Sequence, residues 1–302
     1  MFKHILVPLD GSAPAEAALP AAAFLAARCG ARITLLHIIE RDAPASIHGA
    51  RHLSQPAEAT AYLDEIRCRA FPESAQVACH VHEAAMADVA QGVVAHESEL
   101  APDLIVMCAH GRRDLHEKIF GRIAQQVVGL GRVPVLLLRP PQAGPAQFAC
   151  RTILVPEDGQ PEHEIGLQLA TDLARATGAK LELLFVVPTA ATLSGSDAVS
   201  SQLLPSATRI MLDLAERGAR EHLHQHLTAL VGGAASPALR AAAQVLRGDP
   251  AREVVAAAEK LDADLVVLAT HGKAGSEAFW SGSVAAKIIR DCARPLLLVP
   301  AQ

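Results

Sequence analysis

Two glycines separated by nine residues, the second followed by a serine, are the part of this sequence best suited to hold a phosphate. Gly272 is followed by nine residues and then by Gly282 and Ser283, which open a predicted helix. A helix N-terminus offers free N–H groups and the positive end of the helix dipole, and a preceding glycine lets a phosphate approach the backbone. Ser283 adds a hydroxyl donor. The spacing therefore predicts a phosphate-binding loop.

Asp158 is the candidate for the opposite side of the same ligand. It follows a predicted strand at 151–156, and ligands of doubly wound sheets bind outside the carboxyl ends of the strands. Its carboxylate can accept hydrogen bonds from a sugar hydroxyl or a base amine. Together with the glycine loop, it describes a mononucleotide cleft. The alternative is structural: the aspartate caps the following helix, and the glycines serve only as turn and cap residues.

The sequence contains this arrangement twice. The segment 5–11, Ile-Leu-Val-Pro-Leu-Asp-Gly, recurs at 153–159 as Ile-Leu-Val-Pro-Glu-Asp-Gly, and the segment 103–111 recurs at 264–272. A repeat of this length indicates a duplicated domain, since the periods of solenoids run to only about 20–50 residues. The two copies can therefore be compared position by position.

We assign the two domains to residues 1–140 and 148–302. The proline- and glycine-rich linker at 140–145 is short, so we expect the domains to lie side by side. Within each domain the pattern predicts strands alternating with helices, which indicates parallel βαβ units. The strands are expected at 2–8, 31–38, 76–82, 103–108 and 133–138, and again at 151–156, 180–186, 240–247, 264–269 and 295–299. The helices are expected at 13–29, 57–71, 85–98 and 120–130, and again at 162–178, 206–230, 251–261 and 283–292.

Composition narrows the class of protein. The chain of 302 residues is 51% hydrophobic but only 3% aromatic, which is typical of aliphatic helices on a buried parallel sheet. A net charge of −5 gives no electrostatic basis for binding nucleic acid. Six scattered cysteines without a C-x-x-C pair, and no export signal, predict a cytoplasmic protein. The richest apolar stretch, 17–27, contains Pro20 and is too short to span a membrane.

The V-P-x-D-G opening, the H-G-x9-G-S loop and the closing apolar strand resemble the universal stress protein A family, here as a tandem pair. The resemblance covers nearly the whole chain. It implies two doubly wound α/β domains, each with a five-stranded parallel sheet in the order 3-2-1-4-5 and helices on both faces. It also implies that the closing strands, 133–138 and 296–299, pair the two halves into an intramolecular pseudo-dimer. Association of two chains into a homodimer stays open.

The nucleotide-binding branch of that family is similar in using G-x-x-G-x9-G-[ST] to bind ATP. Carried over by position, the resemblance implies a site in the second half made of Pro156, Asp158, Val186, His271, Gly272, Gly282, Ser283 and Val284. The second half departs from the motif at Ala269, where the first glycine would be. A methyl group there narrows the approach but need not close it.

The first half matches the same motif less well. Asp10, Gly111 and Gly121 are present, but Cys108 replaces the first glycine and Arg122 stands where Ser or Thr is expected. Arg122 can pair with a phosphate, or its own guanidinium can occupy the cleft. We therefore expect ATP, with Mg²⁺, mainly in the second half.

The leading interpretation is a stress-response regulatory protein that binds adenine nucleotide and acts through a protein partner, with neither nucleic acid nor membrane as a partner. An interaction module with empty clefts is one alternative. A slow ATPase is another, but phosphoryl transfer needs a metal ligand, a water-positioning group and a cationic clamp. Only Lys273 and Ser283 are candidates for these roles, so no catalytic residue is assigned.

The remaining chemistry-bearing residues have structural interpretations. His110 and His271, present in both copies, are expected to order their loops. His222 and His226 share one helix face at a spacing that can bind zinc, but no third ligand is evident. A solvated polar face is therefore favoured for His222, His224 and His226. Cys108 is expected to be buried and inert.

Overall fold

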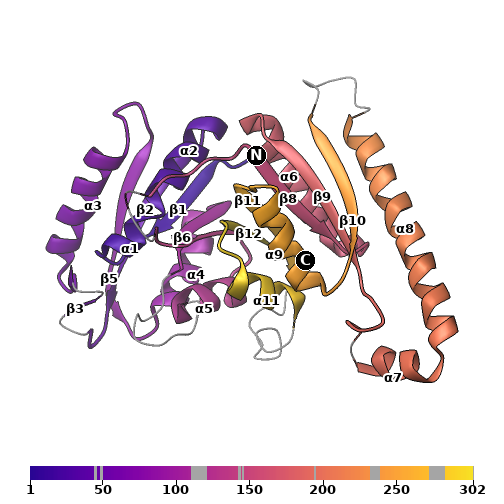
Figure 1. Cartoon of the computed structure of the whole chain (residues 1–302). Helices are drawn as coiled ribbons and strands as arrows, with labels where there is room; N and C mark the ends of the chain where they lie inside the picture. Colours follow the sequence, from indigo (N-terminus) through magenta and orange to yellow (C-terminus); the bar gives the residue numbers. More distant parts are fainter. Residues whose placement is uncertain are drawn as a thin grey trace.

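The computed structural model describes residues 1–43, 46–47, 50–109, 121–141, 144, 146–193, 195–231, 239–271 and 283–301. One sheet of ten strands runs through the molecule (Figure 1). Its strands from the first half are β1 (His4–Pro8), β2 (Arg32–Glu40), β5 (Val77–Met86), β6 (Leu104–Cys108) and β7 (Val135–Leu138). Those from the second half are β8 (Thr152–Glu157), β9 (Lys180–Val187), β10 (Ala241–Arg247), β11 (Leu265–His271) and β12 (Leu296–Ala301). A separate two-stranded sheet pairs β3 (Ser46–Ile47) with β4 (Ala50–Arg51).

The strand order is β10-β9-β8-β11-β12-β7-β6-β1-β2-β5, which gives 3-2-1-4-5 within each half. Strands within a half pair in parallel. The predicted doubly wound α/β fold in tandem is therefore confirmed.

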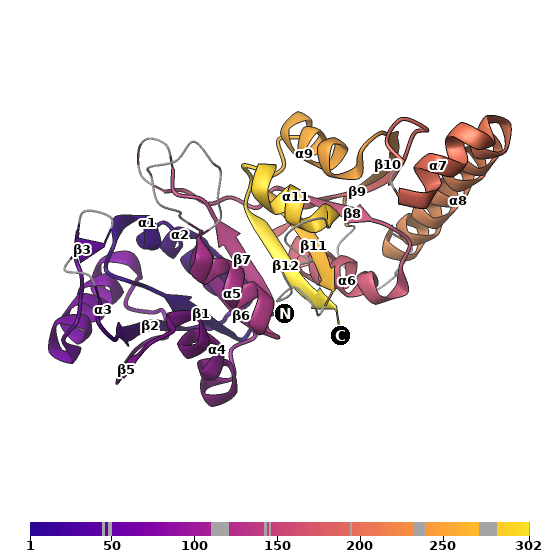
Figure 2. The ribbon, with the colours of Figure 1, turned by 90° about the horizontal axis from the view of Figure 1, so that it is seen from below.

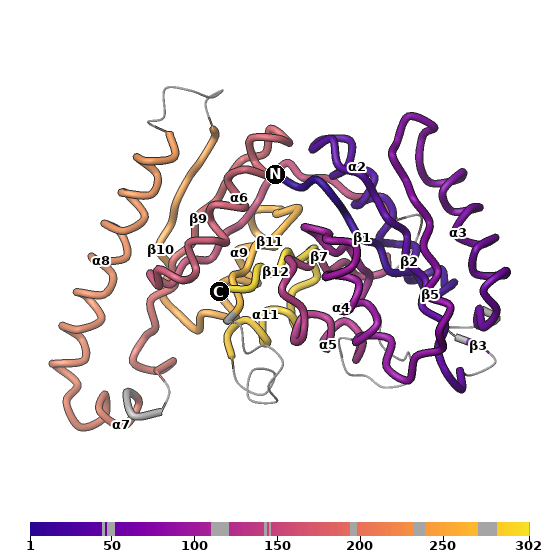
Figure 3. The backbone as a smooth tube through the Cα atoms, turned by 180° about the vertical axis from the view of Figure 1, so that it is seen from behind, coloured from indigo at the N-terminus to yellow at the C-terminus, as the bar shows by residue number. Residues whose placement is uncertain are grey.

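Helices cover both faces of this sheet (Figure 3). In the first half they are α1 (Ala13–Glu16), α2 (Leu19–Cys29), α3 (Pro56–Ala70), α4 (Val89–Leu100) and α5 (Arg122–Leu130). In the second half they are the 3₁₀ turn η1 (Pro161–His163), α6 (Glu164–Thr177), α7 (Gly195–Leu203), α8 (Pro205–Val231), α9 (Pro250–Lys260) and α11 (Val284–Asp291). Helices α2, α3, α6 and α8 contribute to one large hydrophobic cluster, and α4, α5, α9 and α11 to a second, while α8 also forms a small third cluster with β9. The alternating strand residues supply both large clusters, as expected for a sheet that is buried on both faces.

The prediction of one helix over 13–29 was wrong. Helix α1 ends at Glu16, and α2 begins only at Leu19, so that Pro20 lies in the first turn of α2. Proline lacks an N–H and is tolerated in the first turn, where that donor has no intrahelical partner, but not in a helix interior.

The predicted start of the helix at 85 was also early. Strand β5 continues to Met86, where it still pairs with Glu40 of β2. Asp88 then caps α4 by accepting hydrogen bonds from the N–H groups of Ala90 and Gln91. In the second half, α7 precedes α8 in a region for which only the longer helix was predicted.

The two halves join through their closing strands, as predicted. Strands β7 and β12 pair in antiparallel fashion, with Leu136 opposite Leu297 (Figure 2). Across this seam the Arg139 guanidinium donates hydrogen bonds to the carbonyls of Ile289, Arg290 and Cys292 at the end of α11. The halves thus form an intramolecular pseudo-dimer with one continuous sheet. None of the helices that the structure describes has the length and apolar character needed to cross a bilayer.

Candidate functional site

The two repeated aspartates lie in the same kind of turn, directly after the first strand of each half. Asp10 Oδ1 accepts a hydrogen bond from the N–H of Ser12 (2.9 Å), and Asp158 Oδ1 accepts one from the N–H of Gln160 (3.0 Å). The glycine that follows each aspartate has a left-handed φ, 85° at Gly11 and 77° at Gly159. A residue with a side chain would be strained in this conformation. One carboxylate oxygen of each aspartate therefore has a structural role in shaping the turn.

The second oxygen of Asp158 faces a histidine. Its Oδ2 lies 2.8 Å from Nδ1 of His163, and the Asp158 side chain is 51% exposed. The carboxylate is thus at the surface, where a ligand donor can reach it by displacing or joining the imidazole. His163 was not predicted as a partner, because nothing in the sequence distinguishes a lone histidine five residues after the aspartate.

Asp158 shares its sheet edge with three more residues expected at the site. Pro156 lies in β8 beside β9, Val186 is near the end of β9, and Ala269 is near the end of β11. Since β9, β8 and β11 are parallel neighbours, their carboxyl ends meet at one edge. The structure brings these predicted residues together.

The Ala269 methyl group packs toward α6. A Cβ built on Gly166 of that helix would lie 3.4 Å from the Ala269 Cβ. Ala269 stands where the motif has its first glycine, and its methyl group is accommodated because the facing residue of α6, Gly166, has no side chain.

Helix α11, which follows β11, begins at the same edge. Ser283 is its N-cap residue, and the Ser283 Oγ accepts a hydrogen bond from the N–H of Ala286 (3.0 Å). This contact uses a lone pair of the hydroxyl and not its proton, which can still be donated to a ligand. Val284, the first helical residue, is 43% exposed. The predicted Gly272 and Gly282 lie outside the described residues, and so does the side chain of His271.

The first half presents a different helix N-terminus. Gly121 is the N-cap of α5, and the described residues show no side-chain hydrogen bond at this cap. Arg122 is the exposed first helical residue. Cys108 is buried as predicted, and burial, with a contribution from the charge of Asp10, raises its pKa to about 12. Gly111 and His110 lie outside the described residues.

The expectation of a solvated polar face for the helical histidines was wrong for two of them. Only His224 is exposed, whereas the side chains of His222 and His226 are 25% and 20% exposed and face Glu157. Burial, followed by the negative charges of Asp158 and Glu164, raises the pKa of Glu157 to about 8. The third side chain beside the two histidines, for which no candidate was evident in the sequence, is thus Glu157 at the end of β8.

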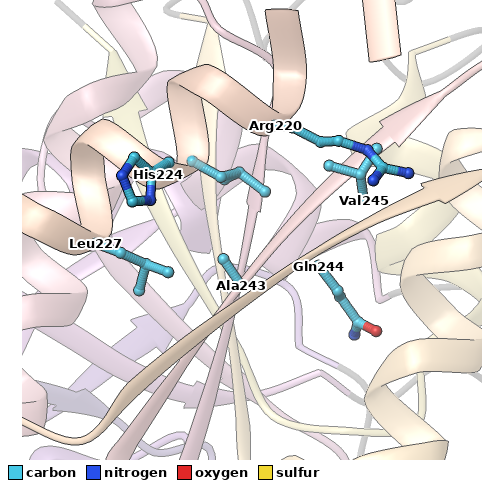
Figure 4. Close-up of a pocket in the computed structure, with 7 residues that line it drawn as sticks. Arg220, His224, Leu227, Ala243, Gln244 and Val245 are labelled. Carbon is cyan, nitrogen blue, oxygen red and sulfur yellow. The ribbon is translucent and has the colours of Figure 1, made fainter. Parts of the chain in front are cut away.

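A shallow groove with a volume of about 310 Å³ lies elsewhere, between α8 and β10 (Figure 4). It is lined by Arg220, Leu223, His224 and Leu227 of the helix and by Ala243, Gln244 and Val245 of the strand. None of the residues predicted to bind nucleotide lines it.

Comparisons with known proteins agree with the duplicated architecture. The model of the universal stress protein family matches residues 1–139 and again 149–300. A universal stress protein of Methanocaldococcus jannaschii is 28% identical over 153 residues, which cover 49% of this chain and 81% of that protein. One of Synechocystis is 31% identical over 138 residues, which cover 46% of this chain and 86% of that protein.

Two solved structures show the same fold over 99% of this chain. A functionally unknown protein from Pseudomonas aeruginosa is 18% identical with a TM-score of 0.69, over 93% of its own length. A universal stress protein from Archaeoglobus fulgidus is 16% identical with a TM-score of 0.60, over 98% of its length. At these identities the likeness concerns the fold alone.

Proposed function

Given that the chain belongs to the universal stress protein family, with two family domains in tandem, we propose that it binds adenine nucleotide, as ATP with Mg²⁺, mainly in its C-terminal half. The observation that carries the proposal is the common position of Asp158 and Ser283. Asp158 follows β8, and Ser283 caps the helix after β11, the strand that pairs with β8. A carboxylate for the base or ribose and a helix N-terminus for phosphate thus lie at one sheet edge.

The difference between the two halves supports the preference for the second. Ser283 combines a helix N-terminus with a hydroxyl, whereas the first half has Gly121 without a hydroxyl and Arg122 at the next position. Ala269 does not weigh against the second half, since its methyl group packs toward Gly166.

An equilibrium titration with labelled ATP tests this proposal. Asp158→Ala is expected to weaken binding by about tenfold, the loss of one or two hydrogen bonds. Gly282→Val is expected to abolish saturable ATP binding, because the valine side chain would block the approach of the phosphate to the backbone. Asp10→Ala and Gly121→Val are the matched controls in the first half and are expected to bind as the wild type does. No saturable binding at millimolar ATP would overturn the proposal.

An interaction module with empty clefts is the second candidate function. The contact between Asp158 Oδ2 and His163 favours it, because the carboxylate already has a donor without nucleotide. In this case His163→Ala would leave the protein folded and still unable to bind ATP. Under the leading proposal, removing the competing imidazole leaves ATP binding intact or strengthens it.

In either case we propose that the protein acts by binding a partner and not by turnover. Its six cysteines are all free, which suits a reducing compartment such as the cytoplasm. The nucleotide would then act as a signal that changes what the protein contacts.

A further inference from the structure

The two copies of the domain differ at the residue between the proline and the aspartate of the V-P-x-D-G motif. Where the first half has Leu9, the second has Glu157. Leu9 is 4% exposed and belongs to the hydrophobic core, and Glu157 is almost as buried, at 9%. A carboxylate in an otherwise apolar position is costly unless a partner compensates it. The partner of Glu157 must therefore be sought on the elements packed over β8.

Helix α8 supplies two histidines to this position. His222 and His226 lie one turn apart on the face of α8 that covers the sheet, so their rings project toward the same point. The Oε2 of Glu157 lies 3.7 Å from Nε2 of His222 and 4.0 Å from Nδ1 of His226. Among the residues that the structure describes, neither nitrogen has a hydrogen-bond partner, and both are shielded from solvent.

These distances are too long for hydrogen bonds, which join nitrogen and oxygen at about 2.7–3.2 Å. They are close to the spacing of ligands around one ion. Bonds of about 2.0–2.2 Å in a tetrahedral site place the ligand atoms roughly 3.4 Å apart. Three ligand atoms of these residues lie within 4.8 Å of one another, so side-chain shifts of up to about 1 Å would close the site.

We infer that Glu157, His222 and His226 form a binding site for a divalent transition-metal ion such as Zn²⁺. Two imidazoles and one carboxylate suit zinc and its neighbours in the first transition row better than Mg²⁺ or Ca²⁺, which prefer all-oxygen sites. Three protein ligands leave a fourth position open to water or to another ligand. Glu157 lies between Pro156 and Asp158 of the proposed nucleotide site, but none of the three ligands is among the residues proposed to bind nucleotide, and the geometry of the metal site does not depend on nucleotide binding.

The surroundings of the three side chains resemble the support that metal ligands receive elsewhere. The second ring nitrogen of His226, Nε2, lies 3.9 Å from a carboxylate oxygen of Glu164. This distance is too long for a hydrogen bond, but a negative charge beside the distal nitrogen raises the basicity of a ligating histidine. Phe185 packs edge-on against His222, with ring centroids 6.1 Å apart, and restricts its rotation.

A histidine cluster in the first half provides the contrast. His80 and His96 meet directly, with their Nε2 atoms 3.1 Å apart, and the Nδ1 of His96 donates to the carbonyl of Gly92. Glu99, the third member, is 59% exposed. These imidazoles already satisfy each other, so the same residue types do not by themselves make an open site.

The test is zinc binding by the full-length protein after dialysis against chelator, measured by calorimetric titration with zinc chloride. His222→Ala and Glu157→Leu are each expected to remove one zinc equivalent, or to weaken its binding by about a hundredfold or more. Glu157→Leu restores the residue of the first half, so it is expected to fold with an unchanged circular dichroism spectrum. His224→Ala, on the same helix but lining the groove of Figure 4, is the matched control and keeps the equivalent.

His80→Gln controls for zinc bound at the other histidine cluster. If that variant loses the equivalent that His222→Ala retains, the inference is overturned. It is also overturned if the wild type binds no zinc at micromolar concentrations. Titration of the wild type with Co²⁺ gives an independent readout: a tetrahedral site is expected to produce intense visible absorption bands that Glu157→Leu lacks.

Discussion

Removing Arg139 is expected to weaken the seam between the two halves. Its Nε donates to Cys292 O at 3.0 Å, and its Nη2 donates to Ile289 O at 2.9 Å and to Arg290 O at 2.8 Å. Hydrogen bonds from a charged donor contribute about 1.5–3 kcal/mol each. Two of the three share one nitrogen and part of the site is exposed, so the contributions do not add fully. A cation at a helix C-terminus contributes about 0.3–1 kcal/mol more.

We therefore expect Arg139→Ala to lower the free energy of unfolding by about 2–3 kcal/mol, which corresponds to a fall in Tm of roughly 3–5 °C for a chain of this size. Urea and thermal unfolding followed by circular dichroism measure the change. Arg290→Ala is the matched control, since the Arg290 side chain is exposed and, among the described residues, forms its ion pair with the adjacent Asp291. Such a surface pair contributes about 0–1 kcal/mol. If Arg139→Ala behaves as this control does, the seam does not depend on the cross-domain contact and the reasoning is refuted.

Three further predictions concern acid stability, thiols and turnover. Burial would raise the pKa of Asp264, but hydrogen bonds from the Arg151 guanidinium and from the backbone N–H groups of Arg151 and Thr152 outweigh it and lower the pKa. The contribution of Asp264 to the free energy of unfolding is thus present at neutral pH and is lost as the pH falls through the lowered pKa. Asp264→Asn is therefore expected to lower the free energy of unfolding by about 1–3 kcal/mol at pH 7 and to flatten its decline in acid. A decline in acid equal to that of the wild type, measured by urea unfolding at several pH values, would contradict this. A thiol reagent is expected to label the exposed Cys68 in the native protein but the buried Cys108 and Cys150 only after unfolding. Burial also raises the pKa of these two thiols, to about 12 and about 11, so that little reactive thiolate forms. Rapid labelling of either buried thiol in the native protein would contradict this prediction. Phosphate release from ATP is expected to be equally slow in the wild type and in Ser283→Ala, and a clear difference would revive the ATPase alternative.

The internal repeat carries most of what the sequence predicts about the fold. Each half ends in an apolar strand after a proline, which predicts that this strand lies at the edge of its sheet. The pairing of Leu136 in β7 with Leu297 in β12 confirms that the two edge strands pair with each other. The break before α2 was visible as Pro20, but the apolar periodicity on both sides of it favoured a single helix. Such local competition between proline and periodicity is settled only by how the segment packs.

The site was predictable to the extent that it lies within contiguous motifs. Asp158 and Ser283 are found from local patterns, because each follows a strand or opens a helix. The contact of Asp158 with His163 is local but follows no recognised pattern, and the approach of Glu157 to His222 joins β8 to α8, which no local pattern links. The cluster of Glu157, His222 and His226 could have been suspected from the comparison of the two copies, since Glu157 stands where the first half has the core residue Leu9.

The stoichiometry of ATP binding tests the central claim most directly. Calorimetric titration of the intact chain is expected to show one equivalent of ATP, lost in Gly282→Val and retained in Gly121→Val. Two equivalent sites would contradict the inequality of the two halves. No binding by the wild type would contradict nucleotide recognition altogether.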